Sequence, residues 1–149
     1  MRNPISIRLV IPSCRTSENI VIKRIVIIDD EPAFGEVIGS VAEGCGYNVS
    51  VTTDPEAFKQ AMAGPEPAMV VLDLSMPKTD GIELLRHLAA IGTGARILII
   101  SGFDRRVTET AANLGRELGL NMLAPLSKPV RIDELRSLLS VEPEQAGPE

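Results

Sequence analysis

The chain alternates short, continuous apolar runs with longer segments in which apolar residues recur every three or four positions. The short runs are rich in β-branched residues and have the length of strands, whereas the longer segments have the period of amphipathic helices. The predicted strands are 23–28, 47–53, 69–72, 95–100 and 120–126. The predicted helices are 32–45, 55–63, 81–91, 104–118 and 132–139, with proline or glycine between most neighbouring elements.

Five strands that alternate with five helices predict an α/β fold with a mainly parallel sheet and helices on both faces. Because right-handed crossovers leave few topologies, we expect a flavodoxin-like, doubly wound sheet with strand order 2-1-3-4-5. Pro125 lies inside the fifth predicted strand. It has no N–H to donate, which suits a strand at the edge of the sheet.

The spacing of apolar residues also predicts which helix faces point toward the sheet. On the first helix the predicted inner residues are Phe34, Val37, Ile38, Val41 and Cys45. On the fourth they are Val107, Ala111, Leu114 and Leu118.

Composition narrows the class of protein. A chain of 149 residues with 44% hydrophobic and 23% charged residues is typical of one globular domain. The net charge of −5 gives no basic surface for direct binding to nucleic acid. Two cysteines are too few for a disulfide framework, which favours a reducing, cytoplasmic setting, and no apolar run is long enough to span a membrane. We expect a poorly ordered leader at 1–21, one domain at 22–141, and an acidic tail or truncated linker at 142–149.

Polar side chains follow four of the predicted strands. Asp29 and Asp30 follow the first, Asp73 the third, Ser101 the fourth and Lys128 the fifth. The carboxyl ends of parallel strands meet at one edge of the sheet, so these side chains are expected to converge there.

Carboxylates packed together repel one another unless a positive group enters. A divalent cation that prefers oxygen ligands, such as Mg²⁺, and the ammonium of Lys128 would supply that charge. A metal ion, a lysine and a serine hydroxyl around a free carboxylate are suited to phosphoryl transfer, with an aspartyl phosphate as the product.

The segments IVIIDDEP, VVLDLSMPKTDG, ILIISG and LSKPV resemble the receiver domain of two-component response regulators. The resemblance covers residues 22 to 141 and includes these motifs in order, each at the end of a predicted strand. It implies a signalling switch and not an enzyme acting on an external substrate. A histidine kinase or phosphotransfer protein would be the phosphoryl donor; the downstream effector is not indicated, and a homodimer is an open alternative.

The resemblance also implies a role for each site residue. Asp73 is expected to be the phosphoacceptor, Ser101 the hydroxyl that turns toward the phosphoryl group, and Lys128 its ionic partner. The expected Mg²⁺ ligands are Asp29, Asp30, Asp73 and the backbone carbonyl of Ser75. One departure is Pro125, because receivers often carry Tyr or Phe three positions before the lysine, which puts the usual aromatic coupling in doubt.

Three alternative functions fit the sequence less well. A small Mg²⁺-dependent phosphatase of the haloacid-dehalogenase type also uses an aspartate nucleophile, but it needs an acidic residue two positions later, where Ser75 stands. An interaction module that is never phosphorylated would not need the acidic cluster. A nucleotide-binding domain would need a glycine-rich loop after the first strand, which is missing.

Two further residues carry sequence hypotheses. Phe103, two positions after Ser101, is expected near the path of an attacking water, where its apolar bulk would slow hydrolysis of the phosphoaspartate. His87 is the sole histidine and is predicted in the middle of a helix, facing solvent and without a role as phosphodonor.

Overall fold

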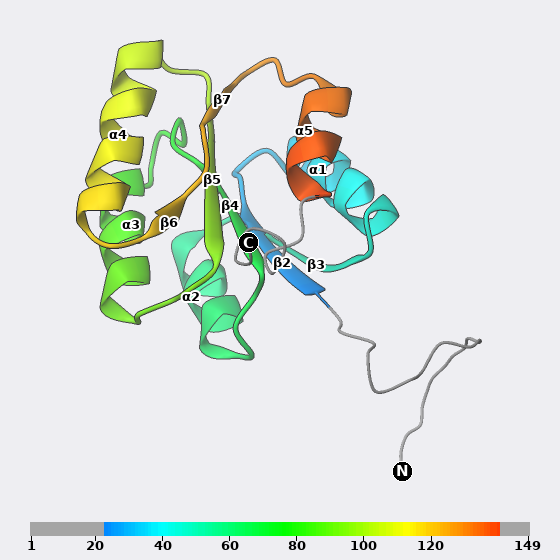
Figure 1. Ribbon diagram of the computed structural model, residues 1–149, viewed down its shortest axis with the longest axis horizontal. Helices are drawn as coiled ribbons and strands as arrows, with labels where there is room; N and C mark the ends of the chain where they lie inside the picture. The colour runs from blue at the N-terminus through cyan, green and yellow to red at the C-terminus, as the bar shows by residue number, and fades with distance from the viewer. Residues whose placement is uncertain (1–22, 141–149) are drawn as a thin grey trace, which may run out of the picture.

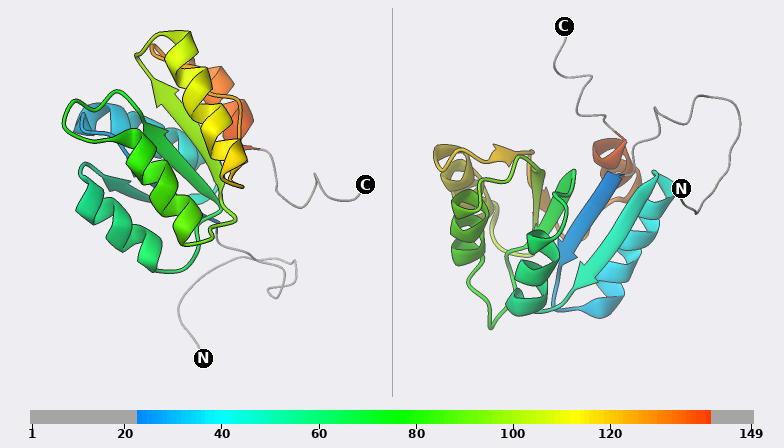
Figure 2. Two further views of the ribbon diagram at one scale, coloured as in Figure 1. Left: turned by 90° about the vertical axis from the view of Figure 1, so that its left-hand side faces the viewer. Right: turned by 90° about the horizontal axis from the view of Figure 1, so that it is seen from below.

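The computed structural model describes residues 23–140. The predicted leader at 1–21 and the predicted acidic tail at 142–149 both lie outside these residues. The described chain forms three layers, with the sheet between two layers of helices (Figure 1, Figure 2). Helices α1 (Pro32–Gly44) and α5 (Ile132–Leu139) cover one face of the sheet. Helices α2 (Pro55–Ala63), α3 (Gly81–Ala90) and α4 (Arg105–Glu117) cover the other.

The sheet has the predicted topology. Its strands are β2 (Lys23–Ile28), β3 (Tyr47–Thr52), β4 (Met69–Asp73), β5 (Arg96–Ser101) and the short β6 (Asn121–Met122). They pair in parallel in the order β3-β2-β4-β5-β6, which is the order 2-1-3-4-5 by position along the chain. The flavodoxin-like prediction is therefore confirmed.

The fifth predicted strand is divided into two short segments. β6 pairs with β5 through Ile97 and Met122, and β7 (Leu126–Ser127) resumes the pairing through Ile100 and Leu126. The fifth segment thus uses one more residue than β5 between these two pairs, which is a bulge. Pro125 lies in the gap, where a residue without an N–H cannot donate to the ladder.

Buried strand residues alternate between two cores, because successive side chains of a strand point to opposite faces. Val26 and Ile28 pack with α2, α3 and α4, whereas Ile25 and Ile27 pack with α1 and α5. This burial on both faces explains why the strands are apolar throughout.

Aspartates cap the first turn of three helices. The Oδ1 atom of Asp54 accepts the N–H of Ala57 at 2.9 Å, and that of Asp104 accepts the N–H of Arg106 at 2.7 Å. Asp80 Oδ1 accepts two N–H groups at the start of α3. Each carboxylate satisfies N–H groups that have no partner within the helix.

The predicted inner faces of α1 and α4 are partly wrong. Val37, Val107 and Leu118 are 46%, 50% and 38% exposed. The buried positions are instead mostly small: Gly35, Ile38, Gly39 and Ala42 on α1, and Thr108, Ala111, Ala112 and Gly115 on α4. The cause is close approach, since a Cβ added to Gly115 would lie 2.5 Å from Met122 Sδ. Small residues face the sheet here because larger ones would not fit.

Candidate functional site

The carboxyl ends of the parallel strands bring the predicted site residues together. Asp29 directly follows β2, and its N–H donates to the carbonyl of Thr52 on β3. Asp73 ends β4 and Ser101 ends the neighbouring β5. Lys128 follows β7, and its N–H donates to the carbonyl of Ser101 at 2.9 Å. Backbone hydrogen bonds and strand pairing hold these residues at the strand ends. The register of the sheet therefore fixes the positions of their Cα atoms.

Three carboxylates form the centre of the site. One carboxylate oxygen from each of Asp29, Asp30 and Asp73 lies within 4.8 Å of the other two. Asp29 and Asp73 are 1% and 2% exposed, whereas Asp30 faces solvent. The cluster therefore has an open side at Asp30 and a buried side at Asp73. Oxygen ligands at this separation can share one cation.

Lys128 supplies the positive charge. Its Nζ lies 3.2 Å from Asp73 Oδ2, 3.5 Å from Asp29 Oδ2 and 3.5 Å from Glu31 Oε1. The same Nζ lies 4.5 Å from the centre of the Phe34 ring, a cation–π distance. Neither contact is predicted from the sequence, in which Glu31 has no assigned charge partner and Phe34 is expected only in the core. Their position within four residues after the Asp29–Asp30 pair was the available signal.

The buried charges shift two pKa values. Burial raises the pKa of Asp29 to about 6; the N–H of Glu31 opposes this rise, the negative charge of Asp73 adds to it, and the ammonium of Lys128 opposes it. Burial alone would lower the pKa of Lys128, but the carboxylates of Asp73, Asp29 and Glu31 outweigh it and raise that pKa above its usual value. Lys128 therefore stays charged, whereas the pKa of Asp29 lies well above that of an ordinary aspartate.

The side chain of Ser75 contacts the nucleophile candidate directly. Its Oγ donates to Asp73 Oδ1 at 2.7 Å, and its N–H donates to the same oxygen at 2.9 Å. Ser75 Oγ also accepts the N–H of Gly102 at 3.3 Å, which joins the loops after β4 and β5. Only the Ser75 carbonyl was predicted to take part in the site. The role of the hydroxyl was not predictable, because nothing in the sequence shows how the two loops meet.

Ser101 is fully buried, and its Oγ accepts the N–H of Phe103 at 2.9 Å. Within residues 23–140 no hydrogen bond joins Ser101 to Asp73. The hydroxyl is thus at the predicted strand end but is engaged with its own loop.

Comparison with models of protein families shows to which family the chain belongs. The model of the response regulator receiver domain matches residues 25–140, which is nearly all of the described chain. This chain belongs to the response regulator receiver family.

Several receivers and their relatives are similar along most of this chain. FixJ, a transcriptional regulatory protein of Bradyrhizobium diazoefficiens, is 32% identical over 125 residues, covering 83% of this chain and 58% of FixJ. The Regulator of RpoS of Escherichia coli is 28% identical over 118 residues, covering 78% of this chain and 34% of that protein. The chain thus spans between about a third and just over half the length of these two relatives.

A solved response regulator from Colwellia psychrerythraea has the same fold. It is 31% identical, with a TM-score of 0.70 that covers 80% of this chain and 95% of the solved one. The likeness covers nearly all of the solved chain, so the two proteins share the fold.

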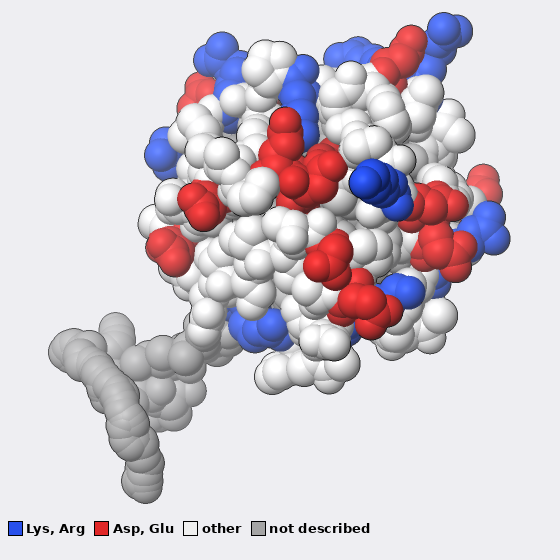
Figure 3. Space-filling view, turned by 180° about the vertical axis from the view of Figure 1, so that it is seen from behind, with Lys and Arg blue, Asp and Glu red and all other residues white. Residues whose placement is uncertain are grey.

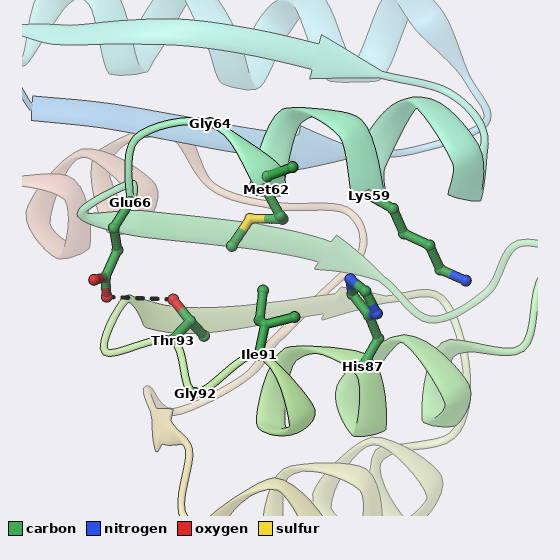
Figure 4. Close-up of a pocket in the computed structure, with 9 residues that line it drawn as sticks. Lys59, Met62, Gly64, Glu66, His87, Ile91, Gly92 and Thr93 are labelled. Atoms are coloured by element: carbon green, nitrogen blue, oxygen red, sulfur yellow. Dashed lines mark hydrogen bonds between the residues drawn. The ribbon is translucent and has the colours of Figure 1, made fainter.

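A separate pocket of about 390 Å³ lies between α2 and α3 of the receiver (Figure 4). His87 lines it opposite Lys59 and Met62, and Thr93 donates a hydrogen bond to Glu66 at its end. His87 is half-buried at this pocket, so it faces solvent only in part. The pocket includes none of the residues of the carboxylate site.

Acidic and basic side chains are mixed on the surface of the receiver, as expected from its acidic composition. On the face shown in Figure 3, basic side chains are interrupted by acidic ones and form no continuous patch. Among residues 23–140, no helix is both long enough and apolar enough to cross a lipid bilayer.

Proposed function

We propose that this receiver accepts a phosphoryl group on Asp73 from a histidine kinase or phosphotransfer protein and thereby switches a partner-binding surface. One observation carries the proposal: the Asp73 carboxylate lies 3.2 Å from a charged lysine and within 4.8 Å of two further carboxylates. A nucleophilic carboxylate with a fixed ammonium and a cation-binding cluster is suited to phosphoryl transfer.

The donor set fits Mg²⁺. Asp29, Asp30 and Asp73 offer oxygen ligands, the backbone carbonyl of Ser75 is a fourth candidate, and exposure at Asp30 leaves room for the waters that Mg²⁺ retains. When bound, the ion would neutralise the negative charge that builds up on the phosphoryl oxygens. The buried carboxylates support this fit, because their mutual repulsion is relieved by a cation.

Three residues of the site have separate roles in the phosphoryl transfer. An oxygen of Asp73 attacks the phosphorus, the bond between phosphorus and the donor imidazole breaks, and the imidazole leaves with the electron pair and takes up a proton. Lys128 holds the phosphoryl group by charge. Ser101 exchanges its hydrogen bond with Phe103 for one that it donates to a phosphoryl oxygen.

The new charge acts on two loops that already meet at the site. Ser75 and Gly102 bridge them, and Ser101 holds Phe103 in the second loop. Loss of these bonds upon phosphorylation would move the loop before α4 and change the adjacent surface. Pro125 stands where many receivers have an aromatic residue. The structural change on phosphorylation is therefore expected to pass through the loop that contains Phe103. We assign the receiver unit to residues 22–141 and place it in the cytoplasm.

A phosphatase is not favoured, because the side chain two positions after Asp73 is the hydroxyl of Ser75, which donates to Asp73 and is not an acid. Self-catalysed gain and loss of the phosphoryl group is the expected chemistry.

The test is intact-mass spectrometry after incubation with acetyl phosphate and Mg²⁺. The parent should gain a single phosphoryl group, and both Asp73→Asn and the parent in EDTA should gain none. Asp54→Asn is the matched control, because that carboxylate caps α2 outside the site, and it should behave as the parent. An unmodified parent, or equal labelling of Asp73→Asn, would disprove the assignment.

A further inference from the structure

A groove of about 670 Å³ lies between α3 and α4, next to the loops that follow β4 and β5. The two helices run side by side in the left view of Figure 2. Two large apolar side chains of this groove face solvent, since Phe103 is 47% exposed and Val107 is 50% exposed. We call it the α3–α4 groove; its apolar lining is Leu74, Met76, Ile82, Phe103, Val107 and Ala111.

Two carboxylates border the α3–α4 groove. Asp80 and Asp104 each use Oδ1 to cap a helix, α3 and α4 respectively. The Oδ2 atom of neither accepts a hydrogen bond from any residue in the described range 23–140. Arg106 lies 3.8 Å from Asp104 with its side chain 90% exposed, so it is free to turn away. The border therefore presents carboxylate oxygens on both sides of an apolar floor.

The walls of the groove are tied to the phosphorylation site. Leu74 and Met76 flank Ser75, whose hydroxyl bonds both to Asp73 and to the N–H of Gly102. On the other wall, the N–H of Phe103 is held by Ser101. A rearrangement at the site would thus alter the groove directly.

We propose that the α3–α4 groove is a docking surface for a cationic amphipathic helix of a protein partner. Apolar side chains spaced three or four residues apart on that helix would pack on Phe103 and Val107. Its lysines or arginines would pair with Asp80 and Asp104. The choice of occupant rests on charge: the groove border is acidic and the whole chain carries −5. A second copy of this chain would bring like charges together and is disfavoured for the same reason.

Coupling to the switch rests on the proposed function. Phosphorylation of Asp73 draws the Ser101 hydroxyl away from the Phe103 N–H, which frees Phe103 to move within the groove. Affinity for the helix then differs between the two states, and the sign of the difference reports whether the groove opens or closes.

The binding test uses a fluorescein-labelled helical peptide of about 15 residues with leucines in one stripe and lysines beside it. Fluorescence anisotropy measures its affinity for the full chain without a phosphoryl donor. Val107→Asp should weaken binding about tenfold or more by placing a charge in the groove. The double change Asp80→Asn with Asp104→Asn should weaken it about fivefold; asparagine still caps helices, so the fold is kept while the charge is removed.

Matched controls distinguish binding in the groove from non-specific binding elsewhere on the protein. Ile132→Asp adds the same charge at an apolar residue that is 40% exposed but lies outside the groove, and it should bind as the parent does. A peptide with glutamate in place of lysine should bind at least about tenfold more weakly. The proposal is overturned if the parent does not bind the peptide, if Val107→Asp and Ile132→Asp behave alike, or if both peptides bind equally. A dimer that is lost in Val107→Asp, without peptide binding, would assign the groove to a second copy instead.

The coupling is tested by repeating the measurement with acetyl phosphate and Mg²⁺, with the phosphorylated fraction read by mass spectrometry. A change in peptide affinity that is absent in Asp73→Asn supports it. Phosphorylation without a change in affinity overturns the coupling alone, and a protein that binds peptide but is never phosphorylated contradicts the proposed function alone.

Discussion

The Nζ atom of Lys128 lies between two buried carboxylates, 3.2 Å from Asp73 Oδ2 and 3.5 Å from Asp29 Oδ2. These residues come from segments far apart in the chain. The ammonium balances part of their charge and leaves the outer side of the cluster to a cation. The same contact ties Lys128 to the stability of the fold as well as to its chemistry.

Lys128→Met should therefore have two effects. Phosphorylation by acetyl phosphate should slow about tenfold or more, because a charge that stabilises the transition state is lost. The melting temperature in EDTA at neutral pH should also fall, since Asp29 and Asp73 lose their counter-charge. The control is Lys59→Met on α2, outside the site, which should match the parent in both measurements. Equal phosphorylation rates for the parent and Lys128→Met would remove lysine from the mechanism.

Stability without divalent cations should fall as the pH rises from about 4 to about 6. The pKa of Asp29 is raised from 3.8 to about 6 in the folded state, so the folded protein binds this proton more tightly than the unfolded chain does. The stabilising proton is fully bound below the unfolded pKa and is lost as the pH passes through the folded one. Chemical denaturation in EDTA across this range measures the slope.

Asp29→Asn should flatten that pH dependence and stabilise the metal-free protein at neutral pH, by on the order of 1–3 kcal/mol. Added Mg²⁺ should stabilise the parent more at pH 7.5 than at pH about 5, because the carboxylate must lose its proton to bind the ion. A parent whose stability rises with pH over this interval would contradict the sign.

Phe103→Glu should speed the loss of the phosphoryl group. Phe103 is anchored by its N–H to Ser101 and presents an apolar ring to solvent beside the site, where it would hinder an attacking water. The measurement is the decay of phosphorylated protein after the donor is removed. Phe103→Leu keeps apolar bulk and should stay close to the parent rate. If Phe103→Glu decays at the parent rate, the ring does not control access of water.

Two glycines near the end of α1 should respond oppositely to alanine. At Gly44 an added Cβ would meet nothing within 4 Å, so Gly44→Ala should stabilise by about 0.5–1 kcal/mol through lower chain entropy. Gly46 has a φ of +95°, which side chains rarely adopt, so Gly46→Ala should destabilise by about 1 kcal/mol or more. Thermal unfolding of the two variants decides the comparison; the same sign for both would contradict it.

Much of the architecture was predictable, because burial on both faces makes the strands of a parallel sheet visible as apolar runs. Proline and aspartate then mark where helices begin, as at Asp54 and Pro55. The inner face of α4 was not predictable from apolar spacing. Gly115 and its small neighbours are inside because the helix lies close to Met122, and that distance is a property of the packed structure.

The sequence by itself determined the alternation of strands and helices, and with it the edge at which Asp29, Asp73, Ser101 and Lys128 meet, because parallel strands end on one side of a sheet. Only the tertiary structure decided which atoms touch. The pairing of Lys128 with Glu31 and Phe34, and the bridge from Ser75 to Gly102, depend on how separate loops pack. Such contacts join residues distant in the chain, and local patterns of hydrophobicity carry no information about them.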